Sequence, residues 1–286
     1  MVKVLITGIA GFIGSHIVEH IQANTDWDIV GLASFRHHGD SARADSFDPA
    51  RVTIHTAELT APISPRLIDR IGPVDYIINA AAESHVDRSI EDPRPFIENN
   101  VSVAITMLEY ARIVKPSKFI QVSTDEVYGP AFGSTLNKEW DPIIPSNPYA
   151  ASKAAQEAIA IGYWRTYGVP VIITNTMNNF GERQDKEKYI ALLISRINAG
   201  QSVEVHGATG RIGSRFYMHA RNHADAILYI LRDDSVPIRF WERPDRYNIV
   251  GDQEINNLEM AERIADILGK PLHYTLVDFH LARPGH

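Results

Sequence analysis

Short apolar runs alternate with helix-like segments through the first 180 residues. The runs that predict buried strands cover 2–6, 28–33, 52–55, 74–79, 118–123 and 169–175. Between them, residues 14–23, 101–114 and 150–167 place apolar side chains at helical spacing. Strands that alternate with helices predict a parallel sheet with helices on both faces, which is the doubly wound α/β fold.

The pattern changes after residue 180. Helices are expected over 189–199, 223–231 and 257–268, with short strands over 203–205 and 246–249. This mixture predicts a larger domain over 1–180 and a smaller mixed α/β lobe over 181–286 that closes over the carboxyl edge of the sheet. The two are expected to be interwoven, with part of 223–250 returning to the sheet.

Composition narrows the classes of function. The 286 residues have a formal net charge of −7 and no cysteine. The charge gives no electrostatic reason to expect nucleic-acid binding, and the lack of cysteine excludes disulfides and thiolate chemistry. No stretch reaches the ~20 apolar residues of a membrane span. The expectation is a soluble, cytoplasmic protein without a membrane partner.

Three glycines follow the first expected strand in the segment TGIAGFIG, residues 7–14. Gly8 allows a tight turn, Gly11 allows close approach of a pyrophosphate, and Gly14 allows the next helix to pack closely on the strand. Free backbone amides at the helix start, including those of Phe12 and Ile13, then face the phosphates. The position of this motif predicts a Rossmann dinucleotide-binding site.

The end of the second expected strand bears on the choice between NAD and NADP. An acid there favours NAD, but the sequence continues with Ser34 and Arg36, which favours NADP slightly because both can bind a 2′-phosphate. The alternative is that Arg36 lies in a solvated loop. Glu58 and Leu59, after the third strand, are weaker candidates for contacts with the adenine.

Tyr149 and Lys153 are four residues apart and therefore share one face of the helix expected over 150–167. An ammonium group beside a phenol is expected to lower the pKa of the phenol toward neutrality. The tyrosinate could then take a proton from a sugar hydroxyl as hydride leaves, while the lysine binds the ribose of the nicotinamide.

Thr124, Asp125 and Glu126 follow the strand expected over 118–123. Catalytic groups gather at the carboxyl ends of strands in open α/β sheets, so Thr124 could bind the reacting hydroxyl beside Tyr149. Adjacent carboxyls in different environments can divide into an acid and a base. The alternative is that both acids simply favour the start of a helix.

These motifs together resemble the extended short-chain dehydrogenase/reductase superfamily, and within it the nucleotide-sugar 4,6-dehydratases. The Thr-Asp-Glu segment is the most discriminating of them. The matching stretches span most of the chain and cover 7–14, 79–89, 100–101, 123–129, 149–153, 175, 178–181, 187–188, 215 and 283–286.

The resemblance implies a cycle in which a sugar is oxidised, loses water and is reduced again. Tyr149 would deprotonate the C4 hydroxyl as hydride leaves C4. Glu126 would remove the C5 proton, and Asp125 would protonate the departing C6 hydroxyl. Hydride would then return to C6, so the dinucleotide would stay bound through each turnover.

The resemblance also implies contacts to the cofactor and the substrate, and a homodimer that uses the helices at 101–114 and 150–167. The implied additional cofactor contacts are Ala80, Ala81 and Asn100. The implied substrate contacts are His85 and Asp87 near the sugar, and Asn178, Asn179, Lys188, Arg215 and Arg283 near the nucleotide or diphosphate.

Three departures from the family pattern bear on specificity. The acid after the second strand is absent. The family's Arg-Asp-Trp is Arg215-Phe216-Tyr217 here, so the base or sugar could differ. The family's C-terminal stretch continues past Arg-Pro-Gly-His, whereas this sequence stops at His286, as a shortened lineage or a clipped chain would.

Two rival functions and one rival site stay open. A 4-epimerase or decarboxylase on the same scaffold would use Tyr149 and Lys153, but would not use Asp125 and Glu126 as acid and base. A regulator that only senses the dinucleotide would not need the Tyr-Lys pair. His206, His219 and His223 lack a carboxylate partner at metal spacing, so they are expected to be surface or packing residues, and no metal is expected.

Overall fold

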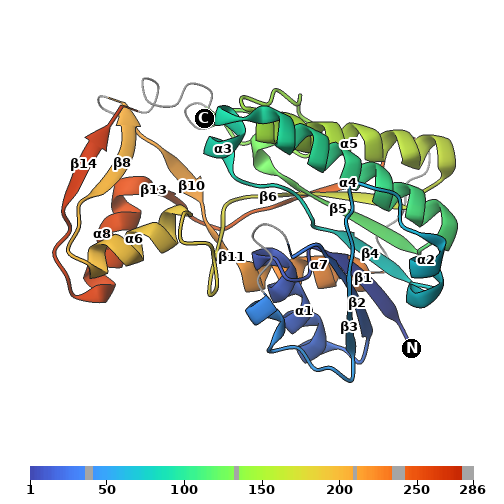
Figure 1. Ribbon diagram of the computed structural model, residues 1–286. Helices are drawn as coiled ribbons and strands as arrows, with labels where there is room; N and C mark the ends of the chain where they lie inside the picture. The colour runs from blue at the N-terminus through green and yellow to red at the C-terminus, as the bar shows by residue number, and fades with distance from the viewer. Residues whose placement is uncertain (36–40, 132–134, 209–210, 234–241, 279–286) are drawn as a thin grey trace. The chain divides into compact units, whose positions relative to one another are not determined.

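The computed structural model describes residues 1–286 except 36–40, 132–134, 209–210, 234–241 and 279–286 (Figure 1). The chain forms two compact units. The first comprises Met1–Thr176 and Arg221–Ile249, and we call it the sheet unit. The second comprises Met177–Ala220 and Val250–His286, and we call it the small unit.

Seven parallel strands form the sheet unit's sheet, in the order β12-β6-β5-β4-β1-β2-β3. The strands are β1 (Lys3–Thr7), β2 (Asp28–Ala33), β3 (Val52–Thr56), β4 (Tyr76–Asn79), β5 (Lys118–Thr124), β6 (Val171–Thr176) and β12 (Asp245–Ile249). The chain builds outward from β1 in one direction through β3, and then from β4 in the other. The gap between β1 and β4 is the topological switch point where such folds bind ligands. The predicted doubly wound fold is confirmed.

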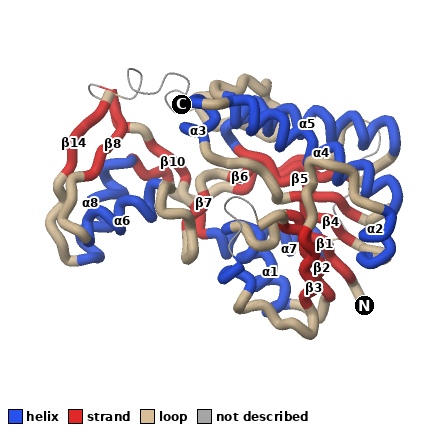
Figure 2. The backbone as a smooth tube through the Cα atoms, viewed as in Figure 1, coloured by secondary structure: helices blue, strands red, loops and turns tan. Residues whose placement is uncertain are grey.

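Helices cover both faces of this sheet (Figures 1 and 2). They are α1 (Phe12–Asn24), α2 (Pro65–Ile71), α3 (Val86–Glu91), α4 (Pro93–Val114), α5 (Pro148–Tyr167) and α7 (Ala220–Arg232), with 3₁₀ helices η1 (Ser41–Ala44) and η2 (Asp125–Tyr128). α4 and α5 lie side by side over one face, and α1 and α7 lie over the other. His20 Nε2 and Asp225 Oδ1, 3.0 Å apart, join α1 to α7.

One hydrophobic core lies between the sheet and the α4–α5 layer. Leu5, Ile77, Phe119 and Ile173 from four strands pack with Met107 of α4, and all five are fully buried. Removing that apolar area from water supplies most of the stabilisation, at roughly 25 cal/mol per Å².

A buried lysine joins β5 to α7, on the face of the sheet opposite α4 and α5. Lys118 Nζ donates to the carbonyl oxygens of Ile230, Leu231 and Asp233, at 2.9, 3.0 and 2.9 Å. These carbonyls lie at the C-terminal end of α7, where the helix leaves acceptors unpaired and a cation is favoured. The lysine therefore fixes α7 against the sheet.

The small unit combines short strands with two amphipathic helices, α6 (Tyr189–Asn198) and α8 (Asn257–Leu268). Its core is formed by α6, α8 and β8, with Leu193, Ile197, Val205, Ala261 and Ile264 buried. The strands are β7 (Asn179–Phe180), β8 (Val203–Ala208), β9 (Arg211–Ile212), β10 (Ser214–Phe216), β11 (Met218–His219), β13 (Glu254–Asn256) and β14 (Tyr274–Val277).

Three helices differ most from the sequence-based expectation, and one of them, α2, lies where no helix was expected. α4 begins at Pro93, eight residues before the expected start at 101, and its first turn contains no acid. α3 was not expected at all, since it is short and its N-cap is His85, whose Nδ1 accepts from the Arg88 amide at 3.4 Å. Among the helices that the structure describes, none has both the length and the apolar character to cross a membrane.

Candidate active site

The β1–α1 turn has the geometry that its glycines predict. Gly8 has φ +69°, a left-handed conformation that disfavours side chains, and a Cβ there would lie 3.1 Å from Ala81 Cα. A Cβ at Gly11 would lie 2.9 Å from Gly8 O, and one at Gly14 would overlap the same oxygen. The turn therefore accepts no larger residue at any of the three positions.

The N-terminus of α1 is suited to an anion. Its N-cap is Gly11, which has no side chain to accept from the first-turn amides, and the first turn contains no acid. Phe12 and Ile13, in that turn, are half-buried. Helices in this condition bind phosphates through their free amides and dipole. The predicted glycine motif therefore fits a dinucleotide pyrophosphate.

Thr7 ties this turn to the end of β4. Its hydroxyl donates to Asn79 Oδ1 at 2.7 Å and accepts from the amides of Ala80 and Ala81, at 3.1 and 3.0 Å. Gly8 N donates to Leu32 O at 2.9 Å, which adds the end of β2. Ala80 and Ala81, both predicted to contact the cofactor, thus adjoin the glycine turn at the switch point.

A buried chain of amides continues from β4 to α5. Asn79 Nδ2 donates to Gln121 Oε1 at 2.9 Å, and Gln121 Nε2 donates to Gln156 Oε1 at 3.1 Å. Gln156 Oε1 also accepts from Lys153 Nζ at 2.6 Å, and Lys153 Nζ donates to Val122 O at 2.7 Å. The predicted catalytic lysine is therefore fixed by groups of a neighbouring strand and its own helix.

Asn100 holds the start of α5 to the segment after β4. Its Nδ2 donates to Ser152 Oγ at 2.8 Å and Glu83 O at 3.0 Å, and its Oδ1 accepts from Glu83 N at 2.8 Å. Ser152 Oγ in turn donates to Tyr149 O at 2.7 Å. Asn100 is fully buried, so its observed contacts position the polypeptide. A direct contact with the cofactor stays a prediction.

Tyr149 is half-buried beside the Thr-Asp-Glu segment. Burial raises the pKa of its phenol well above the usual value, and the charges of Glu126 and Asp125 raise the pKa further, while hydrogen bonding with Thr124 lowers it. The expectation that Lys153 lowers this pKa is wrong for the chain by itself. The charges that act on the phenol are those of Glu126 and Asp125. The lysine ammonium instead donates to Val122 O and Gln156 Oε1.

Lys153 is shifted toward neutrality. Burial lowers the pKa of its ammonium to about 8, against the charge of Glu157, which raises it. Lys153 therefore remains mostly charged at pH 7 and loses its proton in the mildly alkaline range.

Glu126 is fixed by the same residue that starts α5. Asn147 Nδ2 donates to Glu126 Oε2 at 3.0 Å, while Asn147 Oδ1 accepts from the Ala150 amide at 2.8 Å as the N-cap. Thr124 Oγ1 donates to Asp125 Oδ1 at 3.2 Å. The structure thus brings together four of the five predicted catalytic residues, Thr124, Asp125, Glu126 and Tyr149, while the ammonium of the fifth, Lys153, is bonded to Val122 O and Gln156 Oε1.

The other predicted cofactor residues are less informative. Ser34 is half-buried after β2. Glu58 Oε1 accepts from Thr60 Oγ1 at 3.0 Å, and Leu59 is buried in the core. Arg36 lies outside the described residues.

Sequence reasoning missed a second arginine. Arg43 of η1 is 8% exposed, and its Nη1 donates to Ala10 O at 3.3 Å, which places a buried cation against the glycine turn. The sequence offered no signal for it, because Arg43 is 33 positions from Ala10, with α1 and β2 between them.

The predicted substrate residues fall in both units. His85 and Asp87 lie in the sheet unit, at the N-cap and first turn of α3. Asn178, Asn179, Lys188 and Arg215 lie in the small unit. There Asn178 O accepts from Met218 N at 3.0 Å, and Asn179 Nδ2 donates to Met177 O at 2.9 Å. Lys188 is the N-cap of α6. Arg215 Nη1 donates to Ser214 O at 2.8 Å. Arg283 lies outside the described residues.

The three histidines weighed as metal ligands are dispersed. His206 lies in β8 and His219 in β11, where His219 Nε2 is 3.3 Å from Glu182 Oε2. His223 is fully buried in α7, and burial lowers its pKa to about 4. Among the described residues, no three histidine or carboxylate side chains are grouped to hold a metal ion.

Comparison with known proteins agrees with this geometry. Residues 4–249 match the NAD dependent epimerase/dehydratase family, and the chain therefore belongs to that family of nucleotide-sugar dehydratases and epimerases. A relative from Haloferax volcanii, the low-salt glycan biosynthesis protein Agl12, is 34% identical over 93% of this chain and 82% of its own length. The dTDP-glucose 4,6-dehydratase 1 of Escherichia coli K12 is 33% identical over 99% of this chain and 83% of its own.

Two solved structures show the same architecture. The dTDP-glucose 4,6-dehydratase of Bacillus anthracis in complex with NAD superposes with a TM-score of 0.84 at 31% identity, covering 97% of this chain and 85% of that one. The UDP-glucose 4-epimerase of Thermus thermophilus in complex with NAD superposes with a TM-score of 0.86 at 27% identity, covering 99% and 88%. Both activities of the family thus occur on this fold.

Proposed function

We propose that this protein is a nucleotide-hexose 4,6-dehydratase, which converts a nucleotide-hexose to its 4-keto-6-deoxy derivative. The observation that carries the proposal is the pair of carboxyls after β5. Thr124 Oγ1 donates to Asp125 Oδ1 at 3.2 Å, and Asn147, the N-cap of α5 two residues before Tyr149, donates to Glu126 Oε2 at 3.0 Å. A proton acceptor for C4 and two further proton carriers therefore adjoin one another, and the charges of both acids act on the phenol. A dehydratase needs these three groups, whereas epimerisation at C4 needs only the first.

The residues of the chain divide the proton transfers among them. Tyr149 takes the C4 hydroxyl proton in its phenolate form, with Thr124 bonded to the same hydroxyl. Because burial and the two acids raise the pKa of the phenol, Tyr149 must lose its own proton before this step. Glu126, fixed by Asn147, removes the C5 proton that a 4-keto group makes acidic. Asp125 gives a proton to the C6 hydroxyl, which leaves as water. A nicotinamide dinucleotide, when bound, would supply the hydride acceptor for C4 and the hydride donor for C6. The proton that Glu126 removed would return to C5 as hydride reaches C6.

We infer that NADP is preferred slightly over NAD. The last residue of β2 is Ala33, where an acid would hold the ribose hydroxyls of NAD. Arg43 adds a buried positive charge against the glycine turn, in keeping with a 2′-phosphate. Mass spectrometry identifies the dinucleotide that the purified protein carries. In a binding titration, Arg43→Gln is expected to weaken NADP binding about 10-fold or more and to change NAD binding little. Equal affinity for both dinucleotides in the unaltered protein would contradict the preference.

Two finer expectations accompany this proposal. Asn178, Asn179, Lys188 and Arg215 are expected to bind the nucleotide or diphosphate. A homodimer through α4 and α5 is also expected. α4 leaves large apolar side chains exposed, namely Ile97, Ile105 and Ile113. Light scattering after size exclusion gives the oligomeric state.

The second candidate is a 4-epimerase, which the superposition with the Thermus enzyme supports. A panel of ADP-, UDP-, dTDP-, CDP- and GDP-hexoses separates the dehydratase from the epimerase. Dehydration lowers the product mass by one water, whereas epimerisation leaves the mass unchanged and alters only the chromatographic position. A dehydrated product supports the proposal, and an epimer of equal mass contradicts it.

A further inference from the structure

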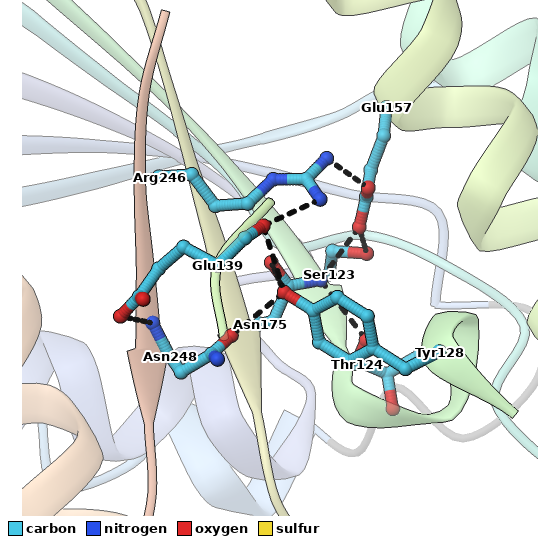
Figure 3. A network of polar contacts seen from close by, with 8 residues as sticks. All are labelled: Ser123, Thr124, Tyr128, Glu139, Glu157, Asn175, Arg246 and Asn248. Atoms are coloured by element: carbon cyan, nitrogen blue, oxygen red, sulfur yellow. Dashed lines mark hydrogen bonds and ion pairs between the residues drawn. The ribbon is translucent and has the colours of Figure 1, made fainter. Parts of the chain in front are cut away.

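A fully buried ion pair joins β12 to α5 in the sheet unit (Figure 3). Arg246 Nη2 and Glu157 Oε2 are 2.5 Å apart, and the two side chains are 1% and 0% exposed. Withdrawing two charges from water is unfavourable unless the remaining donors and acceptors are also satisfied. The other contacts of the pair therefore show what it holds.

The second oxygen of the Glu157 carboxylate joins the carboxyl ends of β5 and β6. Glu157 Oε1 accepts from Ser123 Oγ at 2.5 Å and from Asn175 Nδ2 at 2.7 Å. Asn175 Nδ2 also donates to Thr124 O at 3.0 Å. One carboxylate thus fixes the strand end from which the Thr-Asp-Glu segment begins.

The arginine side of the pair reaches the 3₁₀ helix that contains the two acids. Arg246 Nη1 donates to Glu139 O at 3.0 Å, and the Tyr128 hydroxyl lies within hydrogen-bond distance of the same carbonyl, at 3.1 Å, and of Asn248 Oδ1, at 2.9 Å. Tyr128 is the last residue of η2, which begins at Asp125. Figure 3 shows the guanidinium and the phenol converging on this carbonyl.

Glu157 is also one helical turn from Lys153 on α5. Its charge raises the pKa of Lys153 against the effect of burial. Burial raises the pKa of Glu157 itself, against the charge of Arg246, the hydrogen bonds from Ser123 and Asn175 and the charge of Lys153, which all favour the carboxylate. The charged and titratable groups around the carboxylate are Arg246 on β12, Tyr128 on η2 and Lys153 on α5 itself. A carboxylate in this place favours the ammonium form of the lysine.

We propose that Glu157, held by Arg246, is a positioning residue of the reaction with two separable roles: its acceptor oxygen fixes Thr124, Asp125 and Glu126, and its charge keeps Lys153 an ammonium. This inference rests on the proposed function of the site. Because Glu157 is fully buried, it acts only through the groups that contact substrate or cofactor.

Two double variants separate the roles, because removal of one partner alone would leave a buried unpaired charge. In Glu157→Leu with Arg246→Met, both the acceptor and the charges are lost. We expect kcat about 100-fold lower with KM little changed, because misplacement of the reacting groups by about an ångström has effects of that size. In Glu157→Gln with Arg246→Met, the amide oxygen still accepts from Ser123 and Asn175, so the maximal kcat should stay within about threefold.

The pH profile reports the charge. In Glu157→Gln with Arg246→Met, the alkaline limb of kcat should move about one pH unit toward acid, because Lys153 loses its anionic neighbour. A residue that only stabilised the fold would not move that limb. Glu98→Gln is the matched control, since Glu98 and Arg94 form an exposed ion pair at 3.5 Å, and it should match the unaltered protein throughout.

The outcomes are distinct. An alkaline limb that stays in place in the Gln/Met variant overturns the electrostatic role, even if the Leu/Met variant does not fold. A folded Leu/Met variant with unaltered kcat overturns the positional role. If the unaltered protein dehydrates no nucleotide-hexose, the proposed function fails by itself. The titration of Lys153, followed by lysine-selective NMR in the unaltered protein and the Gln/Met variant, still tests the charge, and amide exchange at 124 and 176 in the Leu/Met variant still tests the position.

Discussion

The sheet unit and the small unit hold their candidate functional residues in different ways. Lys153 belongs to a buried lattice of amides, hydroxyls and strand carbonyls that bond one another across α4, β5 and α5, and the backbone carbonyl of Tyr149 is bonded to the same lattice. Asn179 and Arg215 lie instead on strands of two and three residues, where Asn179 Nδ2 donates to Met177 O and Arg215 Nη1 donates to Ser214 O. The bonds of the first set join residues distant in sequence, and these two bonds of the second set join near neighbours.

The difference suggests a division of labour. Groups that transfer protons must be held to a fraction of an ångström, and long-range buried bonds do this. Groups that recognise one end of a substrate tolerate more freedom, and they can change with the nucleotide. Substitutions in the sheet unit should therefore act on kcat, and those in the small unit on KM.

The largest effect is expected from the Tyr-Lys pair. Tyr149→Phe and Lys153→Met should each lower kcat at least ~10³-fold, because each removes a group that handles the C4 proton or holds the nicotinamide ribose. Circular dichroism should remain unchanged for Tyr149→Phe. Turnover near the unaltered rate in either variant would remove the basis of the comparison.

A smaller loss is expected from the acid that removes the C5 proton. Glu126→Gln should lower the formation of dehydrated product about 10²–10³-fold while leaving oxidation at C4 observable as reduced dinucleotide at 340 nm. Asn147 can still bond the amide oxygen, so the fold should be retained. Loss of both the oxidation and the dehydration would show instead that Glu126 positions Tyr149.

The pH dependence of the unaltered protein sharpens the same point. Burial lowers the pKa of Lys153 to about 8, so the ammonium is present below that pH and is lost above it. kcat should accordingly fall about tenfold per pH unit above pH 8. A constant kcat up to pH 10 would mean that the charge on Lys153 is not required.

The smallest effect is expected in the small unit. Arg215→Ala should raise KM about five- to tenfold and leave kcat within about twofold, as loss of one charge-assisted contact predicts. Lys188→Ala should behave similarly. A fall in kcat with unchanged KM would place these residues among the reacting groups and end the distinction between the two units.

Much of the fold could be predicted because local signals agreed with the tertiary structure. β2 (Asp28–Ala33) and α8 (Asn257–Leu268) have the expected bounds. α8 is marked at both ends, since the Asn256 side chain caps its start and Gly269 ends it in a left-handed conformation. The start of α4 was missed because polar residues 98–100 interrupt the apolar pattern, and Asn100 is buried for its hydrogen bonds instead.

The composition of the site could be predicted, but its support could not. Glycine and Tyr-x-x-x-Lys spacings are local and visible in the sequence. Arg246 and Glu157 are 89 residues apart, and Arg43 is 33 residues from Ala10, so only the fold brings them together. The direction in which the Tyr149 pKa shifts could not be predicted from the Tyr-x-x-x-Lys spacing either. It depends on burial and on Asp125 and Glu126, which belong to another element.

The most direct measurement of the central claim is the mass spectrum of the product formed in D₂O from an accepted nucleotide-hexose. If Glu126 removes the C5 proton and Asp125 releases water, the product should have lost one water and gained one carbon-bound deuterium at C5. A product of unchanged mass without deuterium at C5 would contradict the dehydratase account and indicate epimerisation.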